Sequence, residues 1–183
     1  MKKLLLLLII ASFSINGKAQ ESKINWMSFE DALAAQVKSP KKMMIDMYTV
    51  WCGPCRMLDK NTFQQKDLVK YVNENYYAVK FNAEGDGEVK FKEQTFSNPN
   101  YDPNKKRGRN GQHELASAFG VNAYPTILFL DESATLLAPV KGYHSAQQLE
   151  LFLKVFGTNA YKKINSKDDF ITYQKEFKSD FKD

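Results

Sequence analysis

The two cysteines of the chain lie together in the run Trp51-Cys52-Gly53-Pro54-Cys55, with two residues between them. An apolar run precedes the pair and Pro54 suits the first turn of a helix, so the pair is expected where a buried strand meets a helix. Free N–H groups and a partial positive charge at a helix N-terminus favour a thiolate over a thiol. Cys52 is therefore predicted to be a nucleophile. Cys55, one turn into the helix, is close enough to form a disulfide and release a bound partner.

Two other interpretations of the cysteine pair are weaker. A structural disulfide that closes so short a loop removes little chain entropy from the unfolded state. A zinc site would need Cys52 and Cys55 together with His113 and His144, and that spacing fits no usual zinc finger. We therefore expect no metal and no cofactor, and we expect both histidines to lie at the surface.

The apolar pattern around the pair predicts the elements that position it. Residues 42–50 begin with Lys42 and continue as an apolar run that only Asp46 interrupts. Such a run is typical of a strand buried on both faces. Further strands are expected over residues 76–81, 126–130 and 136–143. Helices are expected over residues 28–37 with Val37 on the apolar face, from 54 to 72 with a break at 61–62, over 114–119, from 145 to 156 and from 166 onwards. This order indicates an α/β protein with a mixed sheet and helices on both faces. Residues 82–111 are polar and rich in turn signals, and we expect a long excursion there, partly helical over residues 89–96.

The N-terminus has the pattern of a secretory signal peptide. Lys2 and Lys3 precede an apolar run of about a dozen residues, which is shorter than the roughly 20 residues that span a membrane. Small residues follow, and we expect cleavage after Ala19 and export to a periplasmic or extracellular space. The predicted organisation is a signal peptide over residues 1–19, one domain over residues 20–157 with a long insertion at about 86–111, and a helical extension over residues 158–183.

Composition excludes several classes of protein. The chain has 183 residues, of which 43% are hydrophobic, so it is expected to fold as one globular domain. The formal net charge is +5, but residues 1–19 contribute three lysines and no acid, which leaves 23 bases and 21 acids in the rest. A net charge of +2 is weak evidence for nucleic-acid binding. We expect no nucleic-acid partner, no stable membrane insertion and a monomer.

Residues 26–157 resemble the thioredoxin family. The run W-C-G-P-C matches the active-site motif of that family in full. Asp46 lies six residues before Cys52, where the family keeps a buried acid, and Lys80 matches the lysine beside that acid. The resemblance implies the thioredoxin fold and a redox disulfide between Cys52 and Cys55. It also implies catalytic roles for Asp46, as acceptor of the Cys55 proton, and for Lys80. A purely structural Asp46–Lys80 pair is the alternative.

A second part of the resemblance concerns the substrate. Tyr124-Pro125 matches the cis-proline turn of the family, where an extended substrate can pair with exposed backbone as an added strand. Gly142 matches the glycine beside the active site. The substrate-binding residues expected from the resemblance are Trp51, Gly53, Pro54, Tyr124, Pro125 and Gly142.

The chain departs from the family at three places. Tyr48 stands where the family usually has Trp, and both the 86–111 insertion and the 158–183 tail are longer than their counterparts. Each long segment could dock a partner or cap the fold, and the sequence leaves both open.

The resemblance implies a thiol–disulfide oxidoreductase acting on exported proteins. Residues 60–80 are more specifically similar to exported thioredoxin-like domains. Gly53-Pro54 places no histidine between the cysteines, which is similar to reducing thioredoxins, so a protein-disulfide reductase fed by a membrane-bound electron donor is favoured. Isomerase, oxidant and a non-catalytic redox-sensing or binding module are the alternatives.

Overall fold

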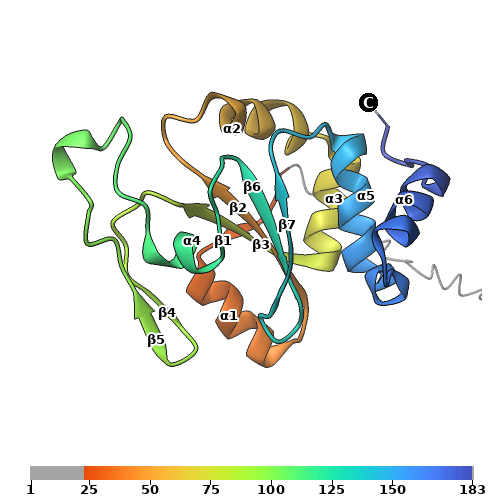
Figure 1. The fold of residues 1–183 in the computed structure, drawn as a ribbon, viewed down its shortest axis with the longest axis horizontal. Helices are drawn as coiled ribbons and strands as arrows, with labels where there is room; N and C mark the ends of the chain where they lie inside the picture. Colours follow the sequence, from red (N-terminus) through yellow and green to blue (C-terminus); the bar gives the residue numbers. More distant parts are fainter. Residues whose placement is uncertain (1–22, 183) are drawn as a thin grey trace, which may run out of the picture.

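A five-stranded sheet forms the centre of the computed structural model, which describes residues 23–182 (Figure 1). Its strands run in the order β1-β3-β2-β6-β7. Strands β1, β3 and β2 are parallel to one another, β6 is antiparallel to β2, and β7 is antiparallel to β6. Their bounds are Trp26–Met27 for β1, Lys42–Tyr48 for β2, Tyr76–Asn82 for β3, Thr126–Leu130 for β6 and Leu136–Lys141 for β7. The expected α/β architecture with a mixed sheet is therefore confirmed.

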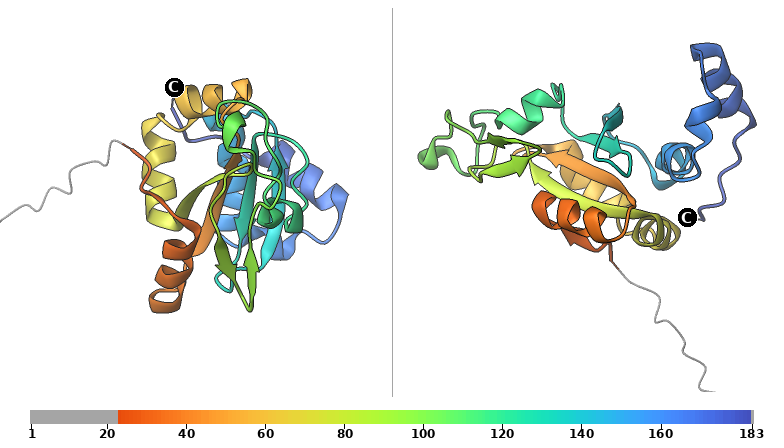
Figure 2. Two further views of the ribbon diagram at one scale, coloured as in Figure 1. Left: turned by 90° about the vertical axis from the view of Figure 1, so that its left-hand side faces the viewer. Right: turned by 90° about the horizontal axis from the view of Figure 1, so that it is seen from below.

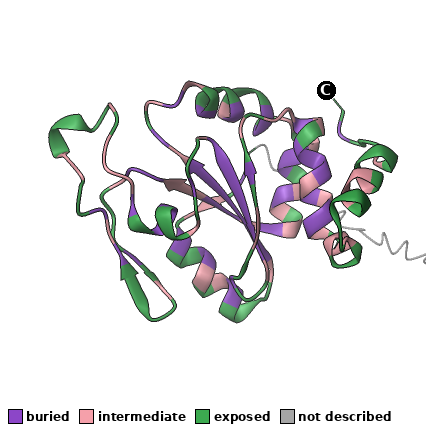
Figure 3. Ribbon diagram, in the orientation of Figure 1, coloured by how far each residue is buried: buried purple, intermediate pink, exposed green. Residues whose placement is uncertain are grey.

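Helices cover both faces of this sheet because the strands alternate their apolar side chains between two cores. Met44 of β2 packs with residues of α3 and α5 on one face, and Ile45 packs with residues of α1 and α4 on the other. Figure 3 shows β2 and β6 almost wholly buried, whereas the outer sides of the helices are exposed. The bounds are Phe29–Lys38 for α1, Gly53–Met57 for α2, Lys66–Asn75 for α3, Glu114–Ala118 for α4, Ala146–Gly157 for α5 and Lys167–Glu176 for α6. Short π and 3-10 turns cover Leu58–Thr62 (η1), Pro103–Lys105 (η2) and Ala160–Lys163 (η3).

The insertion is a hairpin followed by a loop, and the helix expected over residues 89–96 is wrong. Strands β4 (Val89–Phe91) and β5 (Gln94–Phe96) are antiparallel, with Val89 opposite Phe96. Both of these side chains are buried, so a cross-strand apolar pair outweighs any helical tendency. Lys92 turns the chain with a φ of 56°.

Two single-residue expectations are also wrong. Val37 is 87% exposed, because α1 packs through Phe29 and Ala32 and buries Gln36 instead. His113 is 1% exposed, because its ring packs edge-on against Phe81 and both ring nitrogens have partners, the Gly87 carbonyl and the Leu115 N–H that caps α4. The short strand β1 has no counterpart in the sequence-based assignment.

The tail after α5 folds back onto the domain at the end of the molecule opposite the β4–β5 hairpin (Figures 1 and 2). Phe181 is 8% exposed and packs in the same core as α3 and α5. Glu150 of α5 is completely buried and accepts hydrogen bonds from the backbone N–H groups of Asp180 and Phe181. The C-terminal segment thus covers α5. Residues 1–22, which contain the expected signal peptide, and residue 183 lie outside the described part of the chain.

Candidate active site

Cys52 and Cys55 form a disulfide at the N-terminus of α2, just beyond the end of β2. Their Cα atoms are 5.3 Å apart, and each residue is 3% exposed. Cys52 is the N-cap residue, and its Sγ accepts a hydrogen bond of 3.1 Å from the Cys55 N–H. Pro54 occupies the first turn, where its missing N–H costs no helical hydrogen bond. In the reduced protein, the same free N–H groups can stabilise a thiolate on Cys52.

Trp51 is held in place from three sides beside the disulfide. Its indole Nε1 donates a 2.7 Å hydrogen bond to Oε2 of Glu84, a residue only 8% exposed. The Arg109 guanidinium lies over the indole, 4.4 Å from its centroid. Tyr124 packs edge-on against the same ring, with centroids 6.0 Å apart. This packing fixes the indole and makes it the meeting point of the cysteine loop, the proline turn and the insertion.

The Tyr124–Pro125 peptide bond is cis, at the start of β6. Gly142 donates a backbone hydrogen bond of 2.8 Å to the Pro125 carbonyl, and its φ of 90° is one that L side chains rarely adopt. Burial raises the pKa of the Tyr124 hydroxyl, with a further rise from the charge of Glu84. The hydrogen bond from Gly142 to Pro125 joins the loop after β7 to the proline turn.

A buried ion pair lies on the face of the sheet that α2 and η1 cover. Asp46 of β2 is 1% exposed, and its Oδ2 accepts a 3.1 Å hydrogen bond from Lys80 Nζ. Burial raises the pKa of Asp46 from its ordinary 3.8 to about 6, although the nearby Lys80 opposes the rise. Lys80 also pairs with Asp59 of η1. Burial works against the charge of Lys80, but the two carboxylates outweigh it and raise its pKa.

Three exposed apolar side chains lie on the segment that carries the disulfide and on the loop after β7. Val50 is 41% exposed directly before Trp51, and Met57 is 50% exposed at the end of α2. Tyr143 is 37% exposed in the loop after β7. Side chains in these positions are available for apolar contact with a polypeptide that approaches the site.

The structure packs Trp51 against Tyr124, bonds Gly142 to Pro125 and pairs Asp46 with Lys80, as three sets of contacts. It adds Glu84 and Arg109 beside Trp51 and Asp59 beside Lys80. Glu84 follows a predicted strand closely, but nothing in its spacing connects it to Trp51. Arg109 belongs to a run of basic residues, and such runs usually form a solvated surface, so the sequence does not single it out as a site residue.

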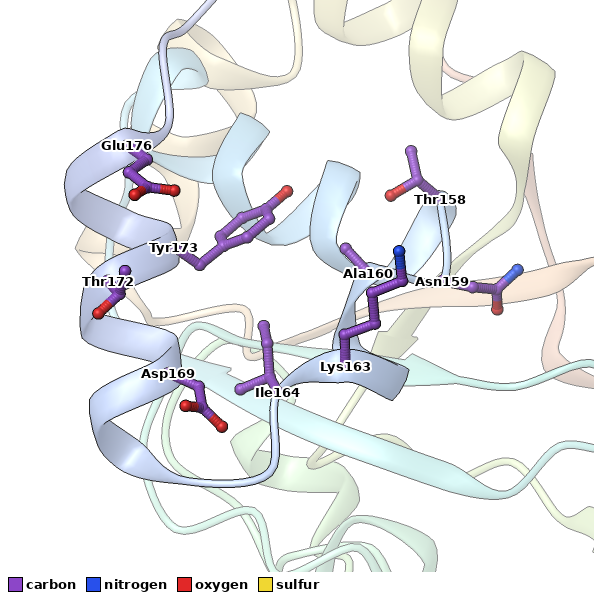
Figure 4. A pocket seen from close by; sticks show the side chains of 9 residues that line it. All are labelled: Thr158, Asn159, Ala160, Lys163, Ile164, Asp169, Thr172, Tyr173 and Glu176. Carbon is purple, nitrogen blue, oxygen red and sulfur yellow. The ribbon is translucent and has the colours of Figure 1, made fainter.

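The described residues 23–182 contain no group of three or more His, Cys, Asp and Glu side chains placed to hold a metal ion. A hollow of about 570 Å³ lies between η3 and α6, and Lys163, Ile164 and Tyr173 are among the residues that line it (Figure 4). This hollow contains none of the residues that the sequence singled out.

Along the described residues 23–182, no helix combines the length and apolarity needed to cross a membrane.

Comparison with known proteins agrees with this geometry. Residues 29–157 match the family model of thioredoxin-like domains. A thioredoxin-like protein from Synechocystis sp. is 33% identical over 64 residues, which cover 31% of this chain and 58% of that protein. The match therefore spans little more than half the length of that relative.

Solved structures show the same fold. A thioredoxin-fold protein from Helicobacter pylori is 22% identical, with a TM-score of 0.57 over 74% of this chain and 81% of its own. A candidate disulphide isomerase from Bacteroides thetaiotaomicron is 27% identical, with a TM-score of 0.52 over 75% of this chain and 95% of its own. The fold and the cysteine pair together support thiol–disulfide redox activity at Cys52 and Cys55.

Proposed function

The chain belongs to the family of thioredoxin-like domains, and on that basis we propose that it reduces disulfide bonds in exported proteins. The observation that carries the proposal is the position of Cys52 at the N-terminus of α2, where the Cys55 N–H points to its sulfur at 3.1 Å. A thiolate at this position is stabilised and can attack a substrate disulfide.

The reaction transfers two electrons from the protein to its substrate. The Cys52 thiolate attacks one sulfur of the substrate disulfide, which forms a mixed disulfide and releases the other sulfur as a thiolate. Cys55 loses its proton and attacks Sγ of Cys52, which releases the second substrate sulfur. The substrate becomes a dithiol, and the protein returns to the Cys52–Cys55 disulfide.

Asp46 is proposed to accept the proton of Cys55. A carboxyl with a pKa of about 6 is ionised at neutral pH, yet it is basic enough to accept a proton in a closed site. Lys80 bonds to Asp46 and also to Asp59, which is more exposed, so it connects the buried carboxyl to the surface. Lys80 is thus proposed to hold Asp46 in its ionised form.

The direction of the reaction rests on the two residues between the cysteines. Gly53 and Pro54 supply no side chain that could stabilise the reduced form, as a histidine would. We expect a reduction potential near the value of about −270 mV known for thioredoxin, and far from the roughly −120 mV of a strong oxidant. Equilibration of the pair with mixtures of reduced and oxidised dithiothreitol measures it. A potential above about −180 mV would contradict the reductase proposal.

Sustained reduction requires a source of electrons. A membrane-bound dithiol donor is proposed to reduce the Cys52–Cys55 disulfide after each cycle. Export is proposed on the N-terminal pattern of residues 1–19, with cleavage after Ala19. Cell fractionation followed by N-terminal sequencing of the mature protein tests both export and the cleavage position.

Disulfide isomerisation is the second candidate, because a relative with 27% identity is a candidate disulphide isomerase. Recovery of activity from scrambled ribonuclease separates the two functions. A reductase lowers the number of disulfides, whereas an isomerase restores the native set without net reduction. Failure of the reduced protein to react with any disulfide would instead indicate a non-catalytic binding or redox-sensing module.

A further inference from the structure

The second half of the insertion is built against the active site. We call residues 102–111 the basic loop. The backbone N–H of Asn110 donates a 2.8 Å hydrogen bond to Oε2 of Glu84, the atom that also accepts from Trp51. Asn110 closes the loop as well, because its side chain bonds to the backbone N–H and carbonyl of Asp102. The loop is therefore attached through Glu84 to the residue next to Cys52.

Two further contacts hold the ends of the loop. The side-chain amide of Asn98 donates to the carbonyls of both Gly85 and Gly111, at 2.9 and 2.7 Å. Directly after the loop, Gln112 donates to the hydroxyl of Tyr124 and to the Val121 carbonyl. The loop thus bridges Trp51 and Tyr124, the two aromatic residues that flank the disulfide and the proline turn. Such a framework presents its side chains in a defined position.

The side chains that the loop presents are mostly cationic. It contains four bases and one acid, and the bases Lys105, Lys106, Arg107 and Arg109 are all exposed. Within the described part of the chain, an ion pair joins only Lys105 of these four to a carboxylate, that of Asp102. Arg109 lies over the Trp51 indole and has its remaining donors available to a ligand.

The loop lies on the side of the molecule that carries the disulfide. In Figures 1 and 2 the turn η2 and helix α2 lie toward the same end of the strands, whereas the β4–β5 hairpin extends toward the other end. The exposed side chains of Val50 and Met57 lie on the segments around the cysteines. Because Arg109 lies over the indole of Trp51, the residue before Cys52, a polypeptide that reaches Cys52 comes close to the Arg109 guanidinium.

We propose that the basic loop recognises substrate proteins whose disulfide-bonded cysteine is flanked by Asp or Glu, with Arg109 as the specificity-determining residue. The inference rests on the proposed reductase function and names its substrate class. Arg109 would bind a substrate carboxylate beside the mixed disulfide, and Lys105, Lys106 and Arg107 would raise the rate of encounter.

A single-turnover experiment on the pre-reduced mature protein tests this proposal, because it requires no electron donor. The substrates are three disulfide-linked peptide dimers of equal length, in which the cysteine is flanked by Asp, Asn or Lys. One peptide disulfide is reduced to two thiols for each Cys52–Cys55 pair oxidised. We expect the Asp peptide to react about tenfold faster than the Lys peptide at about 0.01 M salt. The difference should largely vanish at about 1 M salt, where the screening length is about 3 Å.

Three variants locate the effect. Arg109→Glu should abolish or reverse the ratio of Asp-peptide to Lys-peptide rates, whereas Arg109→Lys should retain most of it. Lys90→Glu is the matched control, because Lys90 is exposed on β4 and the substitution changes the net charge equally. It should leave the ratio unchanged. Because each ratio is measured within one variant, a general change in reactivity does not affect it.

Some results would overturn the proposal. Equal rates for the three peptides in the wild-type protein, or equal ratios in Arg109→Glu and Lys90→Glu, would overturn the substrate class and leave the reductase function intact. If the wild-type protein reacts with no peptide and with no small disulfide, the proposed function fails and the inference fails with it. Equal peptide rates together with Arg109-dependent binding to anionic phosphatidylglycerol vesicles would assign the loop to a membrane surface instead.

Discussion

The indole Nε1 of Trp51 and the backbone N–H of Asn110 donate to the same atom, Oε2 of Glu84, at 2.7 and 2.8 Å. One buried carboxylate oxygen thereby joins the cysteine motif to an insertion that begins more than thirty residues later in the chain. Hydrogen bonds to an ionised acceptor are stronger than neutral ones, so this junction is a firm one. The position of the insertion relative to the disulfide depends on it.

Replacing Glu84 with Ala should release both donors. We expect the free energy of unfolding to fall by about 1–2 kcal/mol, because two partly buried N–H groups lose their shared acceptor. The Trp51 fluorescence should shift to the red in a Trp26→Phe background as the indole becomes solvated. Glu84→Gln keeps an acceptor oxygen at the same place and should retain most of the stability. If Glu84→Ala changes neither quantity, the junction does not hold Trp51.

Gly111 is the tightest point of the basic loop, and it has a matched control in Gly108. A Cβ atom at Gly111 would lie 2.5 Å from the backbone oxygen of Asn100, whereas one at Gly108 would meet its nearest atom at an ordinary 3.8 Å. Gly111→Ala should therefore displace the loop and lower the free energy of unfolding by about 1–3 kcal/mol. Gly108→Ala should change it by less than about 0.5 kcal/mol. Urea unfolding measures both, and equal effects would contradict the close packing at Gly111.

Replacing Cys55 with Ser should trap substrates on Cys52 as mixed disulfides, because attack remains possible while resolution is blocked. The trapped complexes should be visible on non-reducing gels and should disappear with dithiothreitol. Cys52→Ser, the matched control, should trap far less, because Cys55 lies inside α2 and not at the N-cap, where free N–H groups stabilise a thiolate. If Cys55→Ser captures nothing while its Cys52 can still be alkylated, Cys52 does not act as the attacking thiolate.

The parts of the fold that follow from local sequence patterns could be predicted, and those that depend on distant contacts could not. The helices expected from residues 28, 145 and 166 begin there, with Ser28, Ser145 and Ser166 as their N-caps, since an N-cap is determined by the residues next to it. The hairpin over residues 89–96 cannot be read from local sequence, because its stability comes from burial of Val89 and Phe96 against the domain. The exposure of Val37 also depends on distant contacts, because packing against the rest of the domain decides which face of α1 is buried.

The candidate site divides in the same way. Cys52, Cys55 and Pro54 belong to one continuous motif, so their geometry could be anticipated from it. Arg109 reaches Trp51 only because the insertion folds back over the site, whereas Glu84 reaches it from the turn directly after β3. No spacing in the sequence encodes that return, because it depends on side-chain bonds such as those of Asn98 and Asn110.

Asp46 gives the sharpest test of the proton-transfer proposal. Asp46→Asn keeps the shape of the side chain and an oxygen that can accept from Lys80, and Asp59 still neutralises that lysine. The amide N–H₂ takes the place of Oδ1, which has no hydrogen-bond partner among the described residues. The variant should fold normally, and alkylation of reduced Cys52 should be unchanged. Resolution by Cys55 should slow by on the order of 10²-fold, the usual contribution of a general base.

The pH dependence of stability separates this role from a structural one. The pKa of Asp46 rises on folding from 3.8 to about 6, so the folded protein holds the proton more tightly than the unfolded chain does between those values. The wild-type free energy of unfolding should therefore fall by about 3 kcal/mol from this group as the pH rises from about 4 to about 7. Asp46→Asn lacks this loss, so it should be more stable than the wild type at pH 7, and the difference should shrink toward pH 4. Denaturant unfolding of both proteins across this range measures it. A variant that is destabilised at every pH would mark Asp46 as structural, and one with full turnover would show that another base serves Cys55.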